Sequence, residues 1–524
     1  MRFSHSICGL ALAACAAPVA TASGDETKPS IVLIMSDDQD RRLGSTDFQS
    51  VLHRDIYSQG VEFVNHFATT AQCCPSRASF LKGQAAHNTN VTNVHATGLT
   101  LVLDVGKFLN GYNVVRANIT PKGWDHVDAL LDPYTTYYNV PVMSQNGQRP
   151  VYYQGFHSTD AIRTRALERL QSLVTAKQPY YLQIAPYAPH VQNNVHHTIP
   201  LARHMELFPE ARAPRLPNYN PDDEHQAGKG GWPRTLLRMN ETSQATSDMA
   251  FRYQAQALQG LDEIIEDVVA MLDASGALDN TYVIYTSDNG YHIGQHRIPC
   301  GKALFYGEDI KLPFAVRGPG VPKNVTSKIP GVHLDLVPTF LDIAGSSSGV
   351  GSGDGNSKET LNVEFWGTST IEAPNGKLYD TAVDPYELVN LAGRPEHEAV
   401  LNRLNALLLV TKSCAEGTCR DPWSVFASST TNTTIAGGDK LTTMKQAMDP
   451  KYDAFFASFP RVHFASCMQY QDIANEAPFY PESAGTEKGL GLASRRPTNN
   501  FVTTTAGVAI ADANFYAKFK AYES

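Results

Sequence analysis

The chain contains 524 residues, of which 42% are hydrophobic and 18% are charged, a balance typical of a globular protein that is too long for one small core. Its formal net charge of −9 at pH 7 argues against nucleic acid and long polyanions as partners, while a local basic cleft could still bind a small anion. We expect one large domain and a smaller one.

Residues 1–22 have the pattern of a secretory signal peptide. Arg2 precedes an apolar run from Ile7 to Val19, and Ala20-Thr21-Ala22 offers small residues for cleavage. A membrane anchor is the alternative, but the run is rich in alanine, and no other apolar stretch reaches spanning length. We therefore expect a secreted protein without membrane association. Five Asn-x-Ser/Thr sequons agree with export, at Asn90, Asn118, Asn240, Asn324 and Asn432.

Four short apolar runs have the pattern of buried strands, and each leads into polar residues. The runs are Ile31 to Met35, Leu99 to Val105, Tyr180 to Ala185 and Tyr282 to Tyr285. Helical patterns occupy residues 159–173 and 254–272 between them. This alternation predicts an α/β sheet with helices on both faces. Ligands bind such sheets beyond the carboxyl ends of the strands, so the polar residues there should converge on one cleft.

The residues at these strand ends include candidate metal ligands. Asp37 and Asp38 follow the first run, and Asp288 and Asn289 follow the last. Together they offer four oxygen-bearing side chains, which suit a hard cation such as Ca²⁺ or Mg²⁺ and are poorly suited to zinc. Each pair taken alone is equally compatible with turn or helix-cap residues.

The segment from Cys73 to Arg77, Cys-Cys-Pro-Ser-Arg, predicts a helix that begins at a cysteine. Pro75 fits the first turn, where its missing N–H costs nothing, and apolar residues continue with helical spacing. Cys73 then lies at the positive end of the helix dipole, where free N–H groups and Arg77 favour an anion. Taken in isolation, Cys73 is also a candidate for a structural disulfide.

The C-terminal part is expected to be a separate region. A large α/β domain over residues 23–345 is followed by a Gly/Ser-rich linker and shortened connection over 346–376, a smaller subdomain over 377–480 and an unassigned tail over 481–524. The subdomain contains a helical pattern from Glu396 to Val410. Cys414 is expected to pair with Cys419 or with Cys467, and the sequence does not decide between them.

The motif Cys73-Cys74-Pro75-Ser76-Arg77 resembles the signature of the sulfatase family. The stretches Ser287 to Arg297 and Ala86 to Thr92 resemble fungal-type secreted arylsulfatases and the related glucosamine-6-sulfatases. The resemblance spans residues 30 to 393. It implies an alkaline-phosphatase-like fold, in which a large mixed sheet carries helices on both faces and a smaller C-terminal α+β subdomain follows.

The resemblance also implies the chemistry. In that family a formylglycine-generating enzyme converts the motif cysteine to formylglycine, here Cys73. One hydroxyl of the hydrated aldehyde attacks the sulfate ester, and the other expels sulfate. A thiolate would instead leave a thiosulfate with no easy exit.

Individual roles are carried over onto matching residues. One ion, which we expect to be Ca²⁺, would be bound by Asp37, Asp38, Asp288, Asn289 and the modified Cys73. Arg77 would hold the nucleophile, Lys107 and Lys302 would clasp the sulfate, and His190 would move a proton, as an imidazole that titrates near neutral pH can. Taken alone, the lysines fit solvated surface charges better, and only their place in the pattern favours a role in the site. His292 and His296 either line the pocket or have structural roles.

The expected reaction is hydrolysis of small sulfate esters, with aryl sulfates as the first choice. The alternatives are an N-acetylglucosamine-6-sulfatase, a phosphate or phosphonate monoester hydrolase, and an inactive secreted sulfatase-like glycoprotein. The last follows from two segments that are shorter than in relatives, at 94–107 and 346–377. Leu109 also stands where many sulfatases have a histidine.

Overall fold

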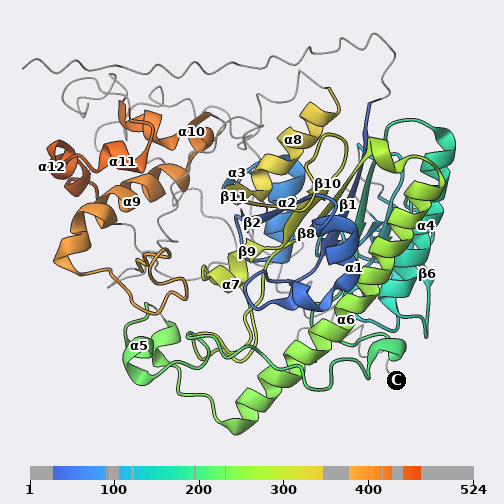
Figure 1. The fold of residues 1–524 in the computed structure, drawn as a ribbon, viewed down its shortest axis with the longest axis horizontal. Helices are drawn as coiled ribbons and strands as arrows, with labels where there is room; N and C mark the ends of the chain where they lie inside the picture. The colour runs from blue at the N-terminus through green and yellow to red at the C-terminus, as the bar shows by residue number, and fades with distance from the viewer. Residues whose placement is uncertain are drawn as a thin grey trace, which may run out of the picture.

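The computed structural model describes residues 28–89, 91, 105–119, 123–193, 196–230, 232–345, 377–415, 417–427 and 441–461. An eleven-stranded mixed sheet forms its centre (Figure 1). The strands are β1 (Ser30–Ser36), β2 (Val61–Phe67), β3 (Val105–Gly106), β4 (Asp128–Leu130), β5 (Val142–Gln145), β6 (Val151–Tyr152), β7 (Tyr181–Ala185), β8 (Thr281–Ser287), β9 (Lys311–Leu312), β10 (Phe314–Arg317) and β11 (Val325–Val332). Their order is β11-β2-β10-β8-β1-β7-β3-β4-β5-β6, and β9 pairs with β2.

The helices that the structure describes include both of those predicted between the strands. They are α1 (Ser50–Leu52), α2 (Cys73–Lys82), α3 (Ala86–Thr89), α4 (Ser158–Ala176), α5 (Asp223–Ala227), α6 (Glu241–Ala274), α7 (Gly307–Ile310), α8 (Leu336–Ile343), α9 (Glu398–Thr411), α10 (Gly417–Arg420), α11 (Met444–Ala447) and α12 (Asp453–Ala457). Helix α6 begins 13 residues before the predicted start at Gln254, because the Asn240 side chain caps it by accepting a hydrogen bond from the Ser243 N–H.

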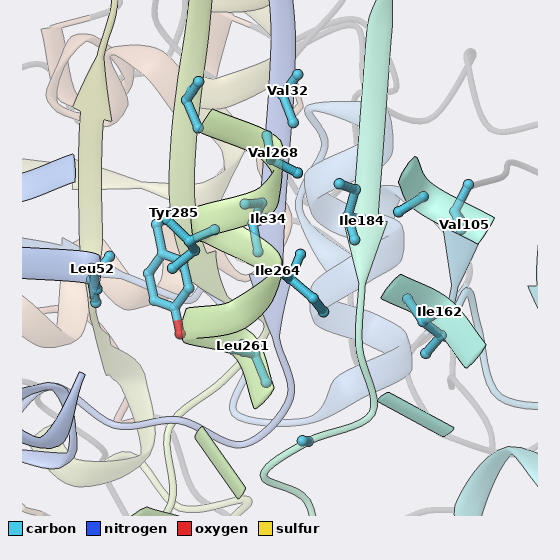
Figure 2. Packing of buried hydrophobic residues seen from close by; sticks show 14 of the residues in the cluster. Val32, Ile34, Leu52, Val105, Ile162, Ile184, Leu261, Ile264, Val268 and Tyr285 are labelled. Carbon is cyan, nitrogen blue, oxygen red and sulfur yellow. The ribbon is translucent and has the colours of Figure 1, made fainter. Parts of the chain in front are cut away.

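The central strand β1 is buried on both faces, as the uninterrupted apolar run predicted. Val32 and Ile34 point into a core that is covered by α4 and α6, where Figure 2 shows Ile34 near Ile264. The alternate residues of β1 pack on the opposite face against Phe80 of α2 and Leu336 of α8. Successive residues of a strand point to opposite faces, so the predicted helices on both faces are confirmed.

The described residues between 377 and 461 form helices α9 to α12 around a second core, with no strand among them. Helix α9 matches the helix expected from Glu396 to Val410. Cys414 is bonded to Cys419, one of the two pairings that the sequence left open, while Cys467 lies outside the described residues. The free cysteines within the described ranges are Cys73, Cys74 and Cys300.

The disulfide loop is fastened to helix α3, which follows the Cys73 helix. The carbonyl oxygen of Cys414 lies 2.7 Å from Nε2 of His87 and accepts a hydrogen bond of 2.8 Å from the Asn88 side chain. Two side chains of one short helix therefore bind a single acceptor on the C-terminal region.

Several predictions concern residues outside the described ranges. These are the signal peptide over 1–22, the strand residues 99–104, the linker over 346–376 and the tail over 481–524. Of the second predicted strand, Leu99 to Val105, the last residue lies in β3. In the part of the chain that is described, none of the helices has the length and apolar character needed to cross a bilayer.

A buried histidine pair predicts that acid destabilises the fold. Nε2 of His66 lies 2.9 Å from Nδ1 of His333, whose Nε2 donates to the Ser287 carbonyl oxygen. Burial lowers the pKa of His333 to about 4 and that of His66 well below its usual value. The unfolded chain therefore binds more protons than the folded one below pH about 6.5, and stability falls as the pH drops from there toward 4.

The expected loss from His333 alone is about 3 kcal/mol of unfolding free energy across that window. Urea unfolding of the wild type and of His333→Gln at pH 7 and pH 4.5 would measure it. His333→Gln should weaken the pH dependence by about one proton, whereas His53→Gln, at an exposed histidine, should leave it unchanged. An equal pH dependence in all three proteins would contradict the prediction.

Candidate functional site

Four neighbouring strands bring the predicted polar residues to one edge of the sheet. The order β8-β1-β7-β3 places these strands side by side, and each neighbouring pair is parallel. Their carboxyl ends therefore face the same way. Asp37 and Asp38 follow β1, Asp288 and Asn289 follow β8, His190 follows β7, and Lys107 follows β3. The structure thus brings these residues together at one edge of the sheet, as predicted.

Cys73 is the first residue of α2, as its sequence context predicted, and Pro75 lies in the first turn. Cys73 is 2% exposed. Its Sγ atom lies 3.6 Å from Oδ1 of Asp37 and 3.9 Å from Oδ1 of Asp38. The ammonium of Lys302 donates to the same sulfur at 2.7 Å and also contacts Asp38. Burial raises the pKa of the Cys73 thiol above its usual value despite the nearby lysines.

Two cations neutralise the buried carboxylates next to Cys73. Arg77 donates to Oδ2 of Asp288 at 2.8 Å and to Oδ2 of Asp37 at 3.2 Å. Nζ of Lys107 lies 2.5 Å from Oδ2 of Asp37. Burial raises the pKa of Asp37, but Lys107, His190 and Arg77 outweigh it, and the net pKa lies below the usual value. These charges tolerate burial because each has a partner of opposite sign.

The acidic cluster fits a hard cation. Oδ2 of Asp38 and Oδ1 of Asn289 are buried without a hydrogen-bond partner among the described residues. A buried oxygen without a donor is costly, and a cation bound there would satisfy both. Ligand atoms of Asp37, Asp38, Cys73 and His190 lie within 4.8 Å of one another. Carboxylate and amide oxygens are ligands that Ca²⁺ and Mg²⁺ prefer.

The backbone at Asp38 also marks this turn as specialised. Its φ of 65° lies in the left-handed region, which costs energy for a residue other than glycine. Two contacts hold it there. The Asp38 N–H donates to Oδ1 of Asp288 at 3.1 Å, and the Asn289 side-chain amide donates to Oδ1 of Asp38 at 2.7 Å.

His190 faces the cluster, and its orientation is set by residues that the sequence reasoning missed. Nε2 of His190 lies 3.4 Å from Oδ2 of Asp38. Nδ1 lies 2.6 Å from both the Tyr187 hydroxyl and the Val191 carbonyl oxygen. A carbonyl oxygen only accepts hydrogen bonds, so Nδ1 carries the proton in the contact with Val191. The unprotonated Nε2 of the neutral ring then faces the cluster. In the sequence, the only indication of this contact was that Tyr187 stands three residues before His190.

Leu109, two residues after Lys107, stands where the resemblance described above indicates a histidine in many family members. It is 5% exposed and packs in an apolar cluster with Cys74, Phe108 and Tyr112. The side chain at this position therefore belongs to the core, and the imidazole near the cluster comes from His190.

The fold matches that of solved proteins. A solved structure, described as a complex with its substrate D-glucosamine-2-N,6-O-disulfate, matches with a TM-score of 0.57 and 21% identity, covering 74% of this chain and 98% of that chain. The sheet, the helices on both faces and the polar strand ends define an alkaline-phosphatase-like α/β protein.

The sequence comparisons define the family. The profile of the Sulfatase family matches residues 29–346. An arylsulfatase of Volvox carteri is 33% identical over 87% of this chain and 84% of its own length. The human N-acetylglucosamine-6-sulfatase is also 33% identical, over 64% of each chain. The chain belongs to the sulfatase family.

Proposed function

We propose that this chain hydrolyses aryl sulfates with a nucleophile derived from Cys73 and a bound calcium ion. The observation that carries the proposal is the position of Cys73, at the start of α2, between the Asp37 and Asp38 carboxylates and the Lys302 ammonium. Within one buried site, this arrangement would supply the reacting side chain, the ligands of the cation and a positive charge for the sulfate.

The nucleophile would be the hydrate of formylglycine at position 73, formed by a formylglycine-generating enzyme. A geminal diol provides one hydroxyl for attack and a second for release of sulfate, which a thiol lacks. The surrounding cations support the attack, since Lys302 already lies against the Cys73 sulfur and would stabilise a developing negative charge there.

The ion would be held by Asp37, Asp38, Asp288 and Asn289 together with residue 73. When bound, calcium would polarise the sulfate and favour the ionised nucleophile. Arg77 and Lys107 keep the carboxylates in place through the contacts described above, and the two lysines add positive charge for an anionic substrate. Such preorganised charge costs no rearrangement during the reaction.

His190 would accept at Nε2 the proton that the attacking hydroxyl loses and pass it to the ester oxygen as that oxygen leaves. Its Nδ1 is held by Tyr187 and Val191, so Nε2 stays directed at the cluster. A positioned imidazole contributes about 10²- to 10⁴-fold as a general acid or base.

The choice of aryl sulfates rests on the wider match to the algal arylsulfatase, which covers 87% of the chain against 64% for the human glucosamine-6-sulfatase. The latter match supports a sulfated N-acetylglucosamine as the second candidate. We further propose that the protein is secreted by way of the signal peptide at residues 1–22.

Turnover of three substrates tests the proposal. We expect purified protein with formylglycine at position 73 to hydrolyse nitrophenyl sulfate with a kcat/KM about tenfold or more above that for N-acetylglucosamine-6-sulfate, a difference of about 1.4 kcal/mol in transition-state stabilisation. Nitrophenyl phosphate should be the poorest substrate. A preference for the sugar would favour the second candidate, faster phosphate hydrolysis would favour a phosphoesterase, and no turnover would favour an inactive sulfatase-like glycoprotein.

A further inference from the structure

Lys302 lies on a loop that is held from two sides by one pair of residues. On one side, His292 and Gly301 form an antiparallel bridge, with N–H to carbonyl bonds of 2.9 and 3.0 Å in the two directions. On the other side, the Leu304 N–H donates to Oδ2 of Asp309 at 2.7 Å. Both residues that flank the Lys302–Ala303 segment are thus fixed.

The two holding residues are joined to each other. Nδ1 of His292 lies 2.6 Å from Oδ1 of Asp309, and because a carboxylate accepts, the imidazole donates. His292 is 2% exposed and Asp309 is fully buried, so water does not weaken this bond. The backbone of Asp309 also accepts the Gly290 N–H at 2.8 Å, next to the proposed metal ligand Asn289.

The His292 ring also lies directly against the loop. A Cβ atom added at Gly301 would approach Nε2 of His292 to 2.8 Å, closer than real Cβ contacts. Gly301 is not among the residues with positive φ, so this close approach, not backbone conformation, is what favours glycine there. Ala303, in contrast, has φ 74°, a left-handed conformation that needs support from its surroundings.

We propose that Asp309 and His292 are positioning residues that act through Lys302. They hold the 301–304 loop in the conformation that brings the Lys302 ammonium to residue 73 and Asp38. This inference rests on the proposed function, because it assigns the pair a role in that same site. It also gives the histidine of the Asp-Asn-Gly-Tyr-His sequence a task that its motif alone did not define.

A double-mutant cycle separates this role from a general structural one. Asp309→Asn should lower kcat for nitrophenyl sulfate about 10- to 100-fold, as expected when a catalytic group is displaced by about 1 Å. Lys302→Ala should cost about 10²- to 10³-fold. If Asp309 acts through Lys302, the double variant should be no slower than Lys302→Ala alone.

A second variant tests the loop from the other side without touching the carboxylate. Gly301→Ala should lower kcat in the presence of Lys302 and have no further effect in the Lys302→Ala background. This variant keeps the test valid if Asp309→Asn does not fold. Asp262→Asn is the matched control, because Asp262 is also buried and accepts backbone N–H bonds, from Val51 and Leu52. It should change kcat by less than about twofold, since it contacts no part of the loop.

The formylglycine content at position 73 is measured in every variant by mass spectrometry, and rates are compared per converted site. If Asp309→Asn or Gly301→Ala lowers kcat by the same factor with and without Lys302→Ala, the effects are independent. That result would overturn the positioning role while leaving the proposed function intact. Absence of turnover in fully converted wild type would overturn the proposed function and this inference with it.

Discussion

Cys73→Ala is expected to reduce sulfate-ester turnover by about 10⁴-fold or more, to the level of the background, because alanine lacks the thiol that must be oxidised to form the proposed nucleophile. The fold should survive. Cys73 is the first residue of α2, whose burial also comes from residues such as Ala78 and Phe80, and loss of one buried sulfur should cost about 1 kcal/mol. Thermal unfolding and nitrophenyl sulfate hydrolysis would be measured together.

The neighbouring cysteine provides a matched control. Cys74 is 1% exposed and packs in the apolar cluster with Phe108 and Leu109, so Cys74→Ala should lose similar stability and keep its activity. Mass analysis of the wild-type peptide should find an aldehyde at position 73 and a thiol at 74. An unmodified thiol or a disulfide at position 73 in active protein would contradict the proposed nucleophile.

Asp38→Ala is expected to abolish calcium binding and to lower turnover by at least about 100-fold. Asp38 offers Oδ2, a buried oxygen without a hydrogen-bond partner among the described residues, and its removal takes away both a ligand and a negative charge. Calcium bound at 100 times its dissociation constant would stabilise the wild type by about 2.7 kcal/mol. Unfolding curves with and without calcium should therefore differ for the wild type and coincide for Asp38→Ala.

Asp40→Asn is the control for this experiment. Asp40 is also buried and its carboxylate accepts the Leu43 N–H, so it has a structural partner within its own turn. Burial raises the pKa of Asp40 to about 7, and the neutral asparagine should therefore be tolerated. Calcium should still stabilise this variant. A calcium effect that survives in Asp38→Ala and disappears in Asp40→Asn would contradict the assignment of the ligands.

The centre of the site was predictable because it depends on patterns that are local in sequence. The apolar run before Asp37 predicts a buried strand, and Pro75 predicts the first turn of the helix that carries Cys73; both are confirmed. Parallel strands then bring distant residues to one edge without further information. The ligand and catalytic roles of these residues stay predictions.

The supporting contacts were not predictable because they join residues through space. Asp309 meets His292 across 17 residues, and neither position has a periodic pattern that points to the other. Strand β3 contains two residues, too few for alternation to identify. The first two turns of α6, from Glu241 to Asp248, likewise lack an apolar stripe, and only the cap at Asn240 marked the true start of the helix.

The hydrogen bonds from His87 and Asn88 to the Cys414 carbonyl link helix α3 to a disulfide-closed loop more than 300 residues later in the chain. The position of α3 therefore depends on whether that disulfide is formed. Cys414 and Cys419 close that loop, which limits how far the shared acceptor can drift. In a compartment that keeps thiols reduced, α3 would lose a fixed anchor close to the helix that begins at Cys73. Passage through an oxidising compartment would thus complete the scaffold beside Cys73.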